Sequence, residues 1–172
     1  GCMAAMQQYD RLLMQRNRML KDHDPDRALL EGLDMKMASV AEPVYRRRKN
    51  FIEELKPIVQ EYYNAVSGGS EQVDIEYETE LDKASLEQLL ASSYDRDRLM
   101  KHTTSGIHRD DFIFTMNGNP IRRYGSQGQQ KSFLVSLKFA QYEIMKRAYG
   151  FAPMLLLDDV FDKLDMGRIG NL

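Results

Sequence analysis

Apolar residues recur at helical spacing through the first third of the chain. Ala5, Leu12 and Met19 repeat every seven residues, a pattern that predicts one face of an amphipathic helix. Asp24 is then expected to cap a second helix, with Pro25 at its first position. The N-terminal region is therefore predicted to be helical and to turn back on itself.

The second helical stretch is longer, and its apolar residues lie three or four positions apart. Such a seam is typical of a helical hairpin or a short coiled coil; its members are Leu30, Leu33, Met37, Val40, Val44, Phe51, Leu55, Ile58 and Tyr62. Pro43 and Pro57 fall inside it, and each removes a backbone hydrogen bond at a cost of roughly 3 kcal/mol. We therefore expect kinks or breaks at both prolines.

The hydrophobic period changes to two after a turn at residues 67–70. The alternation over 73–77 predicts a strand with one face in water, and Ser85 with Gln88 has the spacing of a capping box that opens a helix ending near Met100. Asn117 and Gly118 predict the tight turn of a β-hairpin between strands at 112–116 and 121–124. The pattern therefore indicates a chain that mixes helices and strands.

A further helix is predicted over residues 126–149, with Leu134, Leu137, Ile144 and Ala148 on its inner side. The apolar run 154–157 follows it and resembles a buried central strand. The expected fold class is mixed α/β: a helical arm over 4–66, a connection that completes the arm over 67–105, and part of a nucleotide-binding head over 106–172.

Composition narrows the class of protein further. The 172 residues are 42% hydrophobic and 29% charged, with a net charge of −2, so any DNA contact needs a local basic patch. A single cysteine, Cys2, excludes an internal disulfide framework. No apolar run approaches the roughly 18 residues of a membrane span, and no secretion signal is evident, so we expect a cytoplasmic location.

Two short motifs carry candidate chemistry. Asp158 and Asp159 directly follow the predicted buried strand. Acidic residues occupy the same place in a Walker B element, where the first carboxylate helps to hold Mg²⁺. Residues 125–132 contain Ser-Gln-Gly-Gln at a predicted helix start, where free N–H groups and the helix dipole favour phosphate. Taken singly, the first motif could be a solvated turn and the second an ordinary N-cap.

The order of these motifs resembles the head of ABC-type ATPases, in which a signature motif, Walker B and a D-loop (here Leu164 and Asp165) follow one another. Together with Gly-Ile-His-Arg-Asp-Asp at 106–111, the Asn117-Gly118 turn and the upstream basic helices, the pattern is similar to the RecF family of bacterial DNA replication and repair proteins. This similarity covers essentially the whole chain.

The resemblance implies roles for particular residues. Asp158 would coordinate Mg²⁺, and Asp159 would polarise the attacking water. The signature residues Ser126, Gln127, Gly128 and Gln129 would reach ATP held by a second subunit, with Asp165 at the same interface. The family further implies an ATP-dependent homodimer, DNA near single-strand gaps as a ligand, partners of the RecO and RecR type, and roles in replication, gap repair and the SOS response.

None of the 11 glycines is followed by lysine, so the sequence lacks a Walker A loop. We therefore expect a fragment without its N-terminal Walker A lobe, which by itself should not hydrolyse ATP. Two alternatives remain open: a structural piece of an SMC-like clamp, although an SMC arm needs far longer heptad runs, and a non-catalytic interaction module.

Basic residues suggest a DNA contact of lower specificity. Arg46, Arg47 and Arg48 lie together on the long helix, and Arg16, Arg18 and Lys21 could extend their patch. Such runs are more often solvated helix faces. Arg122 and Arg123, beside the signature, are better candidates. His108 lacks a second ligand at metal spacing, so a structural hydrogen bond is expected there.

Overall fold

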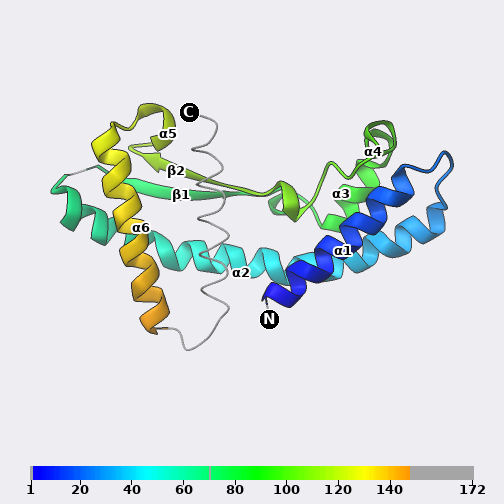
Figure 1. Ribbon diagram of the computed structural model, residues 1–172, viewed down its shortest axis with the longest axis horizontal. Coiled ribbons are helices and arrows are strands. Elements are labelled where there is room, and N and C mark those ends of the chain that lie inside the picture. The colour runs from blue at the N-terminus through cyan, green and yellow to red at the C-terminus, as the bar shows by residue number, and fades with distance from the viewer. Residues whose placement is uncertain (1, 70, 148–172) are drawn as a thin grey trace. The chain divides into compact units, whose positions relative to one another are not determined.

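The computed structural model describes residues 2–69 and 71–147 (Figure 1). Helices dominate, and the strands form one small sheet. In chain order the elements are α1 (Cys2–Leu20), α2 (Arg27–Ser67), β1 (Val73–Glu78), η1 (Glu80–Asp82), α3 (Leu86–Ser92), α4 (Tyr94–Met100), η2 (Ile107–Arg109), β2 (Asp111–Met116), β3 (Asn119–Pro120), α5 (Ile121–Tyr124) and α6 (Gln127–Arg147). None of the helices among these residues is long and apolar enough to cross a membrane.

The chain forms two compact units, and each draws on two separate segments. The first unit is Gly1–Arg47 with Thr79–Asp110, and the second is Arg48–Glu78 with Asp111–Leu172. These units do not coincide with the ranges 4–66, 67–105 and 106–172. The division falls inside α2 because this one helix contributes buried residues to both cores, which a reading along the chain does not reveal.

The core of the first unit is built where α1, the first half of α2 and α3 meet. Its fully buried members include Tyr9, Met37, Ala41, Leu90 and Ile107. The cap of α2 differs from the expectation: the Asp26 carboxylate, not Asp24, accepts the N–H groups of Ala28 and Leu29, at 3.0 and 3.2 Å. Pro25 accordingly lies before the helix and not at its first position.

The prediction of breaks at the two prolines is wrong, because α2 is helical without interruption from Arg27 to Ser67. Pro43 and Pro57 both lie on the exposed side of the helix, as do Ser39 and Glu53, whose carbonyls lose an N–H partner. Water can satisfy those carbonyls, and the buried residues on the opposite side hold the helix together.

The helix predicted to run from Ser85 to about Met100 is divided in two. The capping box is confirmed, since Ser85 and Gln88 exchange hydrogen bonds as predicted. α3 ends at Ser92 and α4 begins at Tyr94; the hydroxyl of Ser93, between them, donates to Asp97 Oδ2 at 2.9 Å. The Ser93 hydroxyl also lies 3.4 Å from the Leu90 carbonyl oxygen, and such side-chain-to-backbone hydrogen bonds compete with those of the helix.

The second unit contains a three-stranded antiparallel sheet in the order β1-β2-β3. Val73 pairs with Met116 and Glu78 with Asp111, so β1 and β2 match along their whole length. Asn117 and Gly118 form the predicted turn with φ values of +51° and +82°. The side chain of Gln60 in α2 accepts the Val73 N–H at 2.8 Å and ties β1 to that helix.

The second strand of the predicted hairpin, over 121–124, is wrong. β3 contains only Asn119 and Pro120, and residues 121–124 form the short helix α5. Pro120 has no N–H to continue a ladder, and turning into a helix buries Ile121 while Arg122 and Arg123 remain exposed.

α6 packs on the sheet through its apolar side. Phe133 meets Phe114 edge-on, with ring centroids 5.3 Å apart, and Leu137, Ala140 and Ile144 are buried below it. Leu134 is only half-buried. The strand predicted at 154–157 and the last inner position of the helix, Ala148, lie outside the described residues.

Candidate functional site

The segment between β3 and α6 is fixed by backbone groups and one glutamine. The Gly125 N–H donates to the Ile121 carbonyl at 2.8 Å, and a Cβ on Gly125 would lie 2.8 Å from that same oxygen, so this position needs glycine. The Gln130 amide donates to the carbonyls of Gly125 and Ile121 at 3.0 and 3.3 Å. The start of α6 is therefore held firmly against α5.

The signature residues open α6 through a second capping box. The Ser126 hydroxyl oxygen accepts the Gln129 N–H at 3.1 Å, and Gln129 Oε1 accepts the Ser126 N–H at 2.9 Å. The sequence motif thus has a local structural purpose, the one expected of an ordinary N-cap. This arrangement alone does not distinguish a cap from a ligand site.

The other end of the Gln129 amide is also occupied. Gln129 Nε2 donates to Glu71 Oε1 at 2.9 Å, which joins the loop before β1 to the start of α6. This hydrogen bond is the main cause that lowers the pKa of Glu71 below its usual value. Within the motif, Gln129 is consequently the side chain least available to a ligand from outside.

The remaining three positions face solvent. Ser126, Gln127 and Gly128 are exposed, and the backbone N–H groups of Gln127 and Gly128 have no acceptor among the described residues. A Cβ added to Gly128 would meet only Ser126 Oγ, at 3.9 Å. Unlike Gly125, this glycine is not required by the packing of the described residues around it.

Such a surface is chemically suited to an anion. Two N–H donors and a hydroxyl stand at the positive end of a 21-residue helix, with no side chain at Gly128 to obstruct a close approach. The residues present therefore fit a phosphate group brought from outside this chain.

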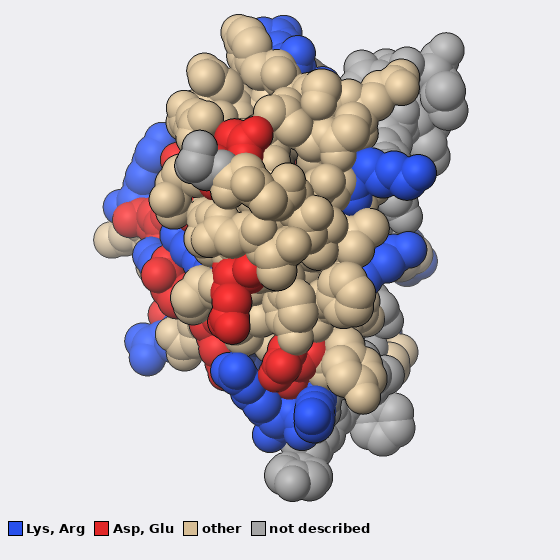
Figure 2. Space-filling view, turned by 90° about the vertical axis from the view of Figure 1, so that its left-hand side faces the viewer, with Lys and Arg blue, Asp and Glu red and all other residues tan. Residues whose placement is uncertain are grey.

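The predicted cations differ in their surroundings. Arg122 and Arg123 lie exposed on α5, beside the signature residues. Arg46 and Arg47 are also exposed, and Arg46 pairs with Glu42 at 2.9 Å. On the face shown in Figure 2, Lys and Arg are scattered and in places alternate with Asp and Glu.

For two arginines of the suggested DNA patch, the prediction of a DNA contact is wrong. Arg48 is only 3% exposed, and Arg16 is completely buried. Arg16 Nε donates to Asp34 at 2.7 Å and Nη1 to Asp97 at 2.7 Å, so its charge is neutralised inside the first unit. Neither guanidinium faces solvent, and neither can bind a phosphate in this structure.

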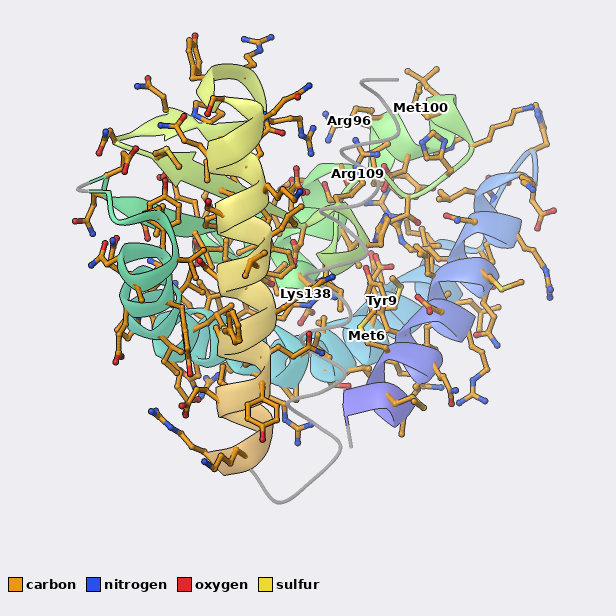
Figure 3. The ribbon with its side chains drawn as sticks, turned by 60° about the vertical axis from the view of Figure 1, so that its left-hand side comes forward. Met6, Tyr9, Arg96, Met100, Arg109 and Lys138 are labelled. Carbon is orange, nitrogen blue, oxygen red and sulfur yellow. The ribbon has the colours of Figure 1, made fainter. Side chains whose placement is uncertain are left out.

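His108 makes structural hydrogen bonds, as expected. Tyr9, labelled in Figure 3, donates to His108 Nδ1 at 2.8 Å, and Nε2 donates to the Thr103 carbonyl at 3.3 Å. Burial lowers the pKa of His108, which favours this neutral form. A Cβ on Gly106 would collide with the Tyr9 hydroxyl, which explains why this residue is glycine.

Residues 2–69 and 71–147 contain no group of three or more potential metal ligands.

The buried ionic cluster around Arg16 is the feature that sequence reasoning missed. A possible signal was the position of Arg16 itself, four residues after the core residue Leu12 and four before Leu20 on the apolar side of α1. Asp158, Asp159, Leu164 and Asp165 lie outside the described residues, so their roles stay predictions.

The chain has relatives among known proteins. No family model matches the chain. A DNA replication and repair protein RecF from Parabacteroides distasonis is 43% identical over 168 residues, which are 98% of this chain and 46% of that protein. The RecF protein from Cytophaga hutchinsonii is 42% identical over 172 residues, again 98% of this chain and 46% of the relative.

Solved structures show the same likeness in three dimensions. The recombination mediator protein RecF-ATPrS in the RecFOR pathway superimposes with a TM-score of 0.76 at 28% identity, over 85% of this chain and 42% of that one. RecF-ATP in the same pathway also reaches 0.76, at 24% identity, and supports the fold alone. The mixed helical and β fold class is thus confirmed. The resemblance to the RecF proteins is confirmed over nearly the whole of this chain, which spans about half the length of those relatives.

Proposed function

We propose that this chain carries the signature-bearing part of a RecF-type, ATP-dependent DNA-binding protein of the cytoplasm. The complete protein acts in DNA replication, in recombinational repair of gaps and in the SOS response. It binds duplex DNA near single-strand gaps and works with RecO- and RecR-type partners. Two heads close on ATP and Mg²⁺, and DNA stimulates a slow hydrolysis.

In this proposal the start of α6 contacts ATP that is bound mainly by the other subunit. Ser126 and the N–H groups of Gln127 and Gly128 would donate to the γ-phosphate, while Gln129 would hold the loop in place through Glu71. Asp158 would hold Mg²⁺, Asp159 would orient the attacking water, and Leu164 and Asp165 would lie at the dimer interface. Without a Walker A loop, these residues alone do not turn over ATP.

Gly128 is the observation that carries the proposal. Glycine near a helix start is less favourable than alanine by up to about 1 kcal/mol, and the described residues leave open space around this one. A ligand that approaches the backbone closely accounts for the missing side chain. The adjacent exposed N–H groups point to an anionic ligand.

The test is to substitute Gly128→Ala in a full-length RecF-type protein that carries this sequence. We expect equal or slightly higher thermal stability together with at least a tenfold loss of ATP-dependent dimerisation, measured by sedimentation velocity, because each lost tenfold needs only about 1.4 kcal/mol. Asp159→Asn should retain ATP-dependent dimerisation and lose DNA-stimulated hydrolysis.

Gly32 provides the matched control. Like Gly128, it is an exposed helical glycine with open space around it, since nothing lies within 4 Å of an added Cβ, but it lies in the interior of α2, where its N–H is part of the helix. Gly32→Ala should raise stability in the same way and leave dimerisation unchanged. Unchanged dimerisation in the Gly128→Ala protein would contradict the proposal.

A further inference from the structure

One edge of β2 is left open along most of its length. β1 pairs with all six residues of β2, whereas β3 pairs only with Thr115 and Met116. Among the described residues, no strand lies beside Asp111–Phe114 on the side away from β1. Natural sheets normally pair, cover or charge such an edge, because it presents backbone donors and acceptors in a row.

The register identifies which backbone groups face the open side. The Asn117 N–H donates to the Gln72 carbonyl at 2.7 Å, on the side of β1. Because strand residues alternate, Thr115 and Ile113 also bond toward β1, and Phe112 and Phe114 direct their N–H groups away from it. The Phe112 N–H is held by Asp111 Oδ1 at 2.9 Å, whereas the Phe114 N–H has no acceptor among the described residues.

A groove runs beside this edge. It encloses a cavity of about 290 Å³ between β2, α5 and α6. Phe133 and the half-buried Leu134 contribute apolar surface from α6, and Phe112 and Phe114 contribute it from β2. The charged residues Asp111, Arg122 and Arg123 line it as well. A mainly apolar groove along an unpaired edge is the arrangement that receives an added strand: the backbone groups give affinity, and the groove takes alternate apolar side chains.

We propose that this edge binds an extended, apolar strand from the part of a RecF-type protein that this chain does not span. The relatives are about twice as long as the matched region, since the chain covers 46% of each. A complete protein therefore has ample further chain to cover the groove. The strand would run beside Asp111–Phe114, accept a hydrogen bond from the Phe114 N–H and extend the sheet past the point where β3 ends.

Amide hydrogen exchange, followed residue by residue by NMR, tests the pairing without ATP. The probe is the separately produced part of the Parabacteroides distasonis RecF protein that this chain does not match. In the chain alone, the Phe114 amide should exchange rapidly and the Ile113 amide slowly, because only the latter is paired with β1. Adding the probe should slow exchange at Phe114 by about 100-fold or more and leave Ile113 unchanged.

A matched pair of variants tests the groove. Leu134→Lys should weaken binding of the probe at least about tenfold, because it places a charge in apolar surface. Leu134→Met keeps an apolar side chain of similar size, so this variant should bind the probe as the unchanged chain does. Lys138→Ala, at an exposed residue of the same helix labelled in Figure 3 that does not line the groove, should bind normally.

Three results would overturn the inference. Slow exchange at Phe114 in the dilute chain alone would mean that the edge is already paired. Protection that grows with the concentration of the chain, without the probe, would identify a second copy as the occupant. Rapid exchange of the Phe114 amide in the presence of saturating probe would exclude an added strand. Each result is independent of ATP, so the proposed function can fail or hold separately.

Discussion

Replacing Arg16 by methionine should strongly destabilise the first unit. The guanidinium is fully buried and donates to Asp34 and Asp97, each at 2.7 Å, and to Thr103 Oγ1 at 3.0 Å. Methionine fills much of the same space but leaves two buried carboxylates without their cation. Removing one partner from a buried ion pair costs about 3–5 kcal/mol, a large fraction of the roughly 5–15 kcal/mol that stabilises a typical domain.

The two carboxylates should respond differently to the loss of Arg16. Asp97 keeps three donors, namely the Ser93 hydroxyl and both the N–H and the hydroxyl of Thr104. Burial already raises the pKa of Asp34 despite the nearby arginine, and without the cation this pKa should rise further. Above about pH 4, the ordinary pKa of aspartate, the unfolded chain has released this proton, whereas Asp34 of the folded variant still binds it. The stability of the variant therefore falls as the pH rises.

The measurement is urea-induced unfolding followed by far-UV circular dichroism at pH 5 and pH 7. The control is Arg18→Met, because Arg18 is exposed on the same helix two residues further along. We expect a loss of about 3 kcal/mol or more for Arg16→Met at pH 7, a smaller loss at pH 5, and little change in the control. A loss below about 1 kcal/mol, or one without pH dependence, would refute this reasoning.

Three further predictions concern other parts of the chain. Burial lowers the pKa of His108, so the folded chain binds fewer protons than the unfolded chain below about pH 6.5. Stability should therefore decline as the pH falls through that range, by at most about 1.4 kcal/mol per pH unit. In urea titrations His108→Asn should flatten this decline, and His102→Asn, at an exposed histidine, should not. Gly118→Val should cost about 1 kcal/mol in thermal unfolding, because its φ of +82° disfavours a side chain. Replacing both Arg122 and Arg123 by glutamine in the full-length protein should reduce the slope of log DNA affinity against log salt by about 2, and an unchanged slope would exclude them as phosphate contacts.

Local features were predicted well from the sequence because neighbouring residues determine them. The capping box of Ser85 and Gln88, the strand over 73–78 and the Asn117-Gly118 turn each depend on a few adjacent positions. The same holds for the start of α6, where Ser126 and the residues after it were recognised both as a possible cap and as a signature motif. In the structure Ser126 and Gln129 form the cap. The proposed role in binding a ligand rests on the exposure of Ser126, Gln127 and Gly128 to solvent.

Errors arose where distant contacts outweighed local preference. Two prolines predicted breaks in α2, but both face solvent and the opposite side of the helix is buried. Residues 121–124 were predicted as the second strand of a hairpin, yet Pro120 ends the ladder and Ile121 is buried in a helical turn. Asp24 was predicted to cap α2, but the path of the backbone instead brings the Asp26 carboxylate to the N–H groups of Ala28 and Leu29.

By itself, the sequence determined the alternation of helix, strand and turn, the resemblance to RecF proteins and the candidate phosphate-binding start of α6. The tertiary structure decided which charged side chains are exposed to solvent and therefore available to a ligand. Arg16 and Arg18 belong to the same basic helix, but one is buried against Asp34 and Asp97 while the other is exposed. Periodicity identifies the face of a helix, whereas the loss of water around a charge depends on elements far away in the chain. Asp97, 81 residues from Arg16, is such a partner, and only folding brings the two together.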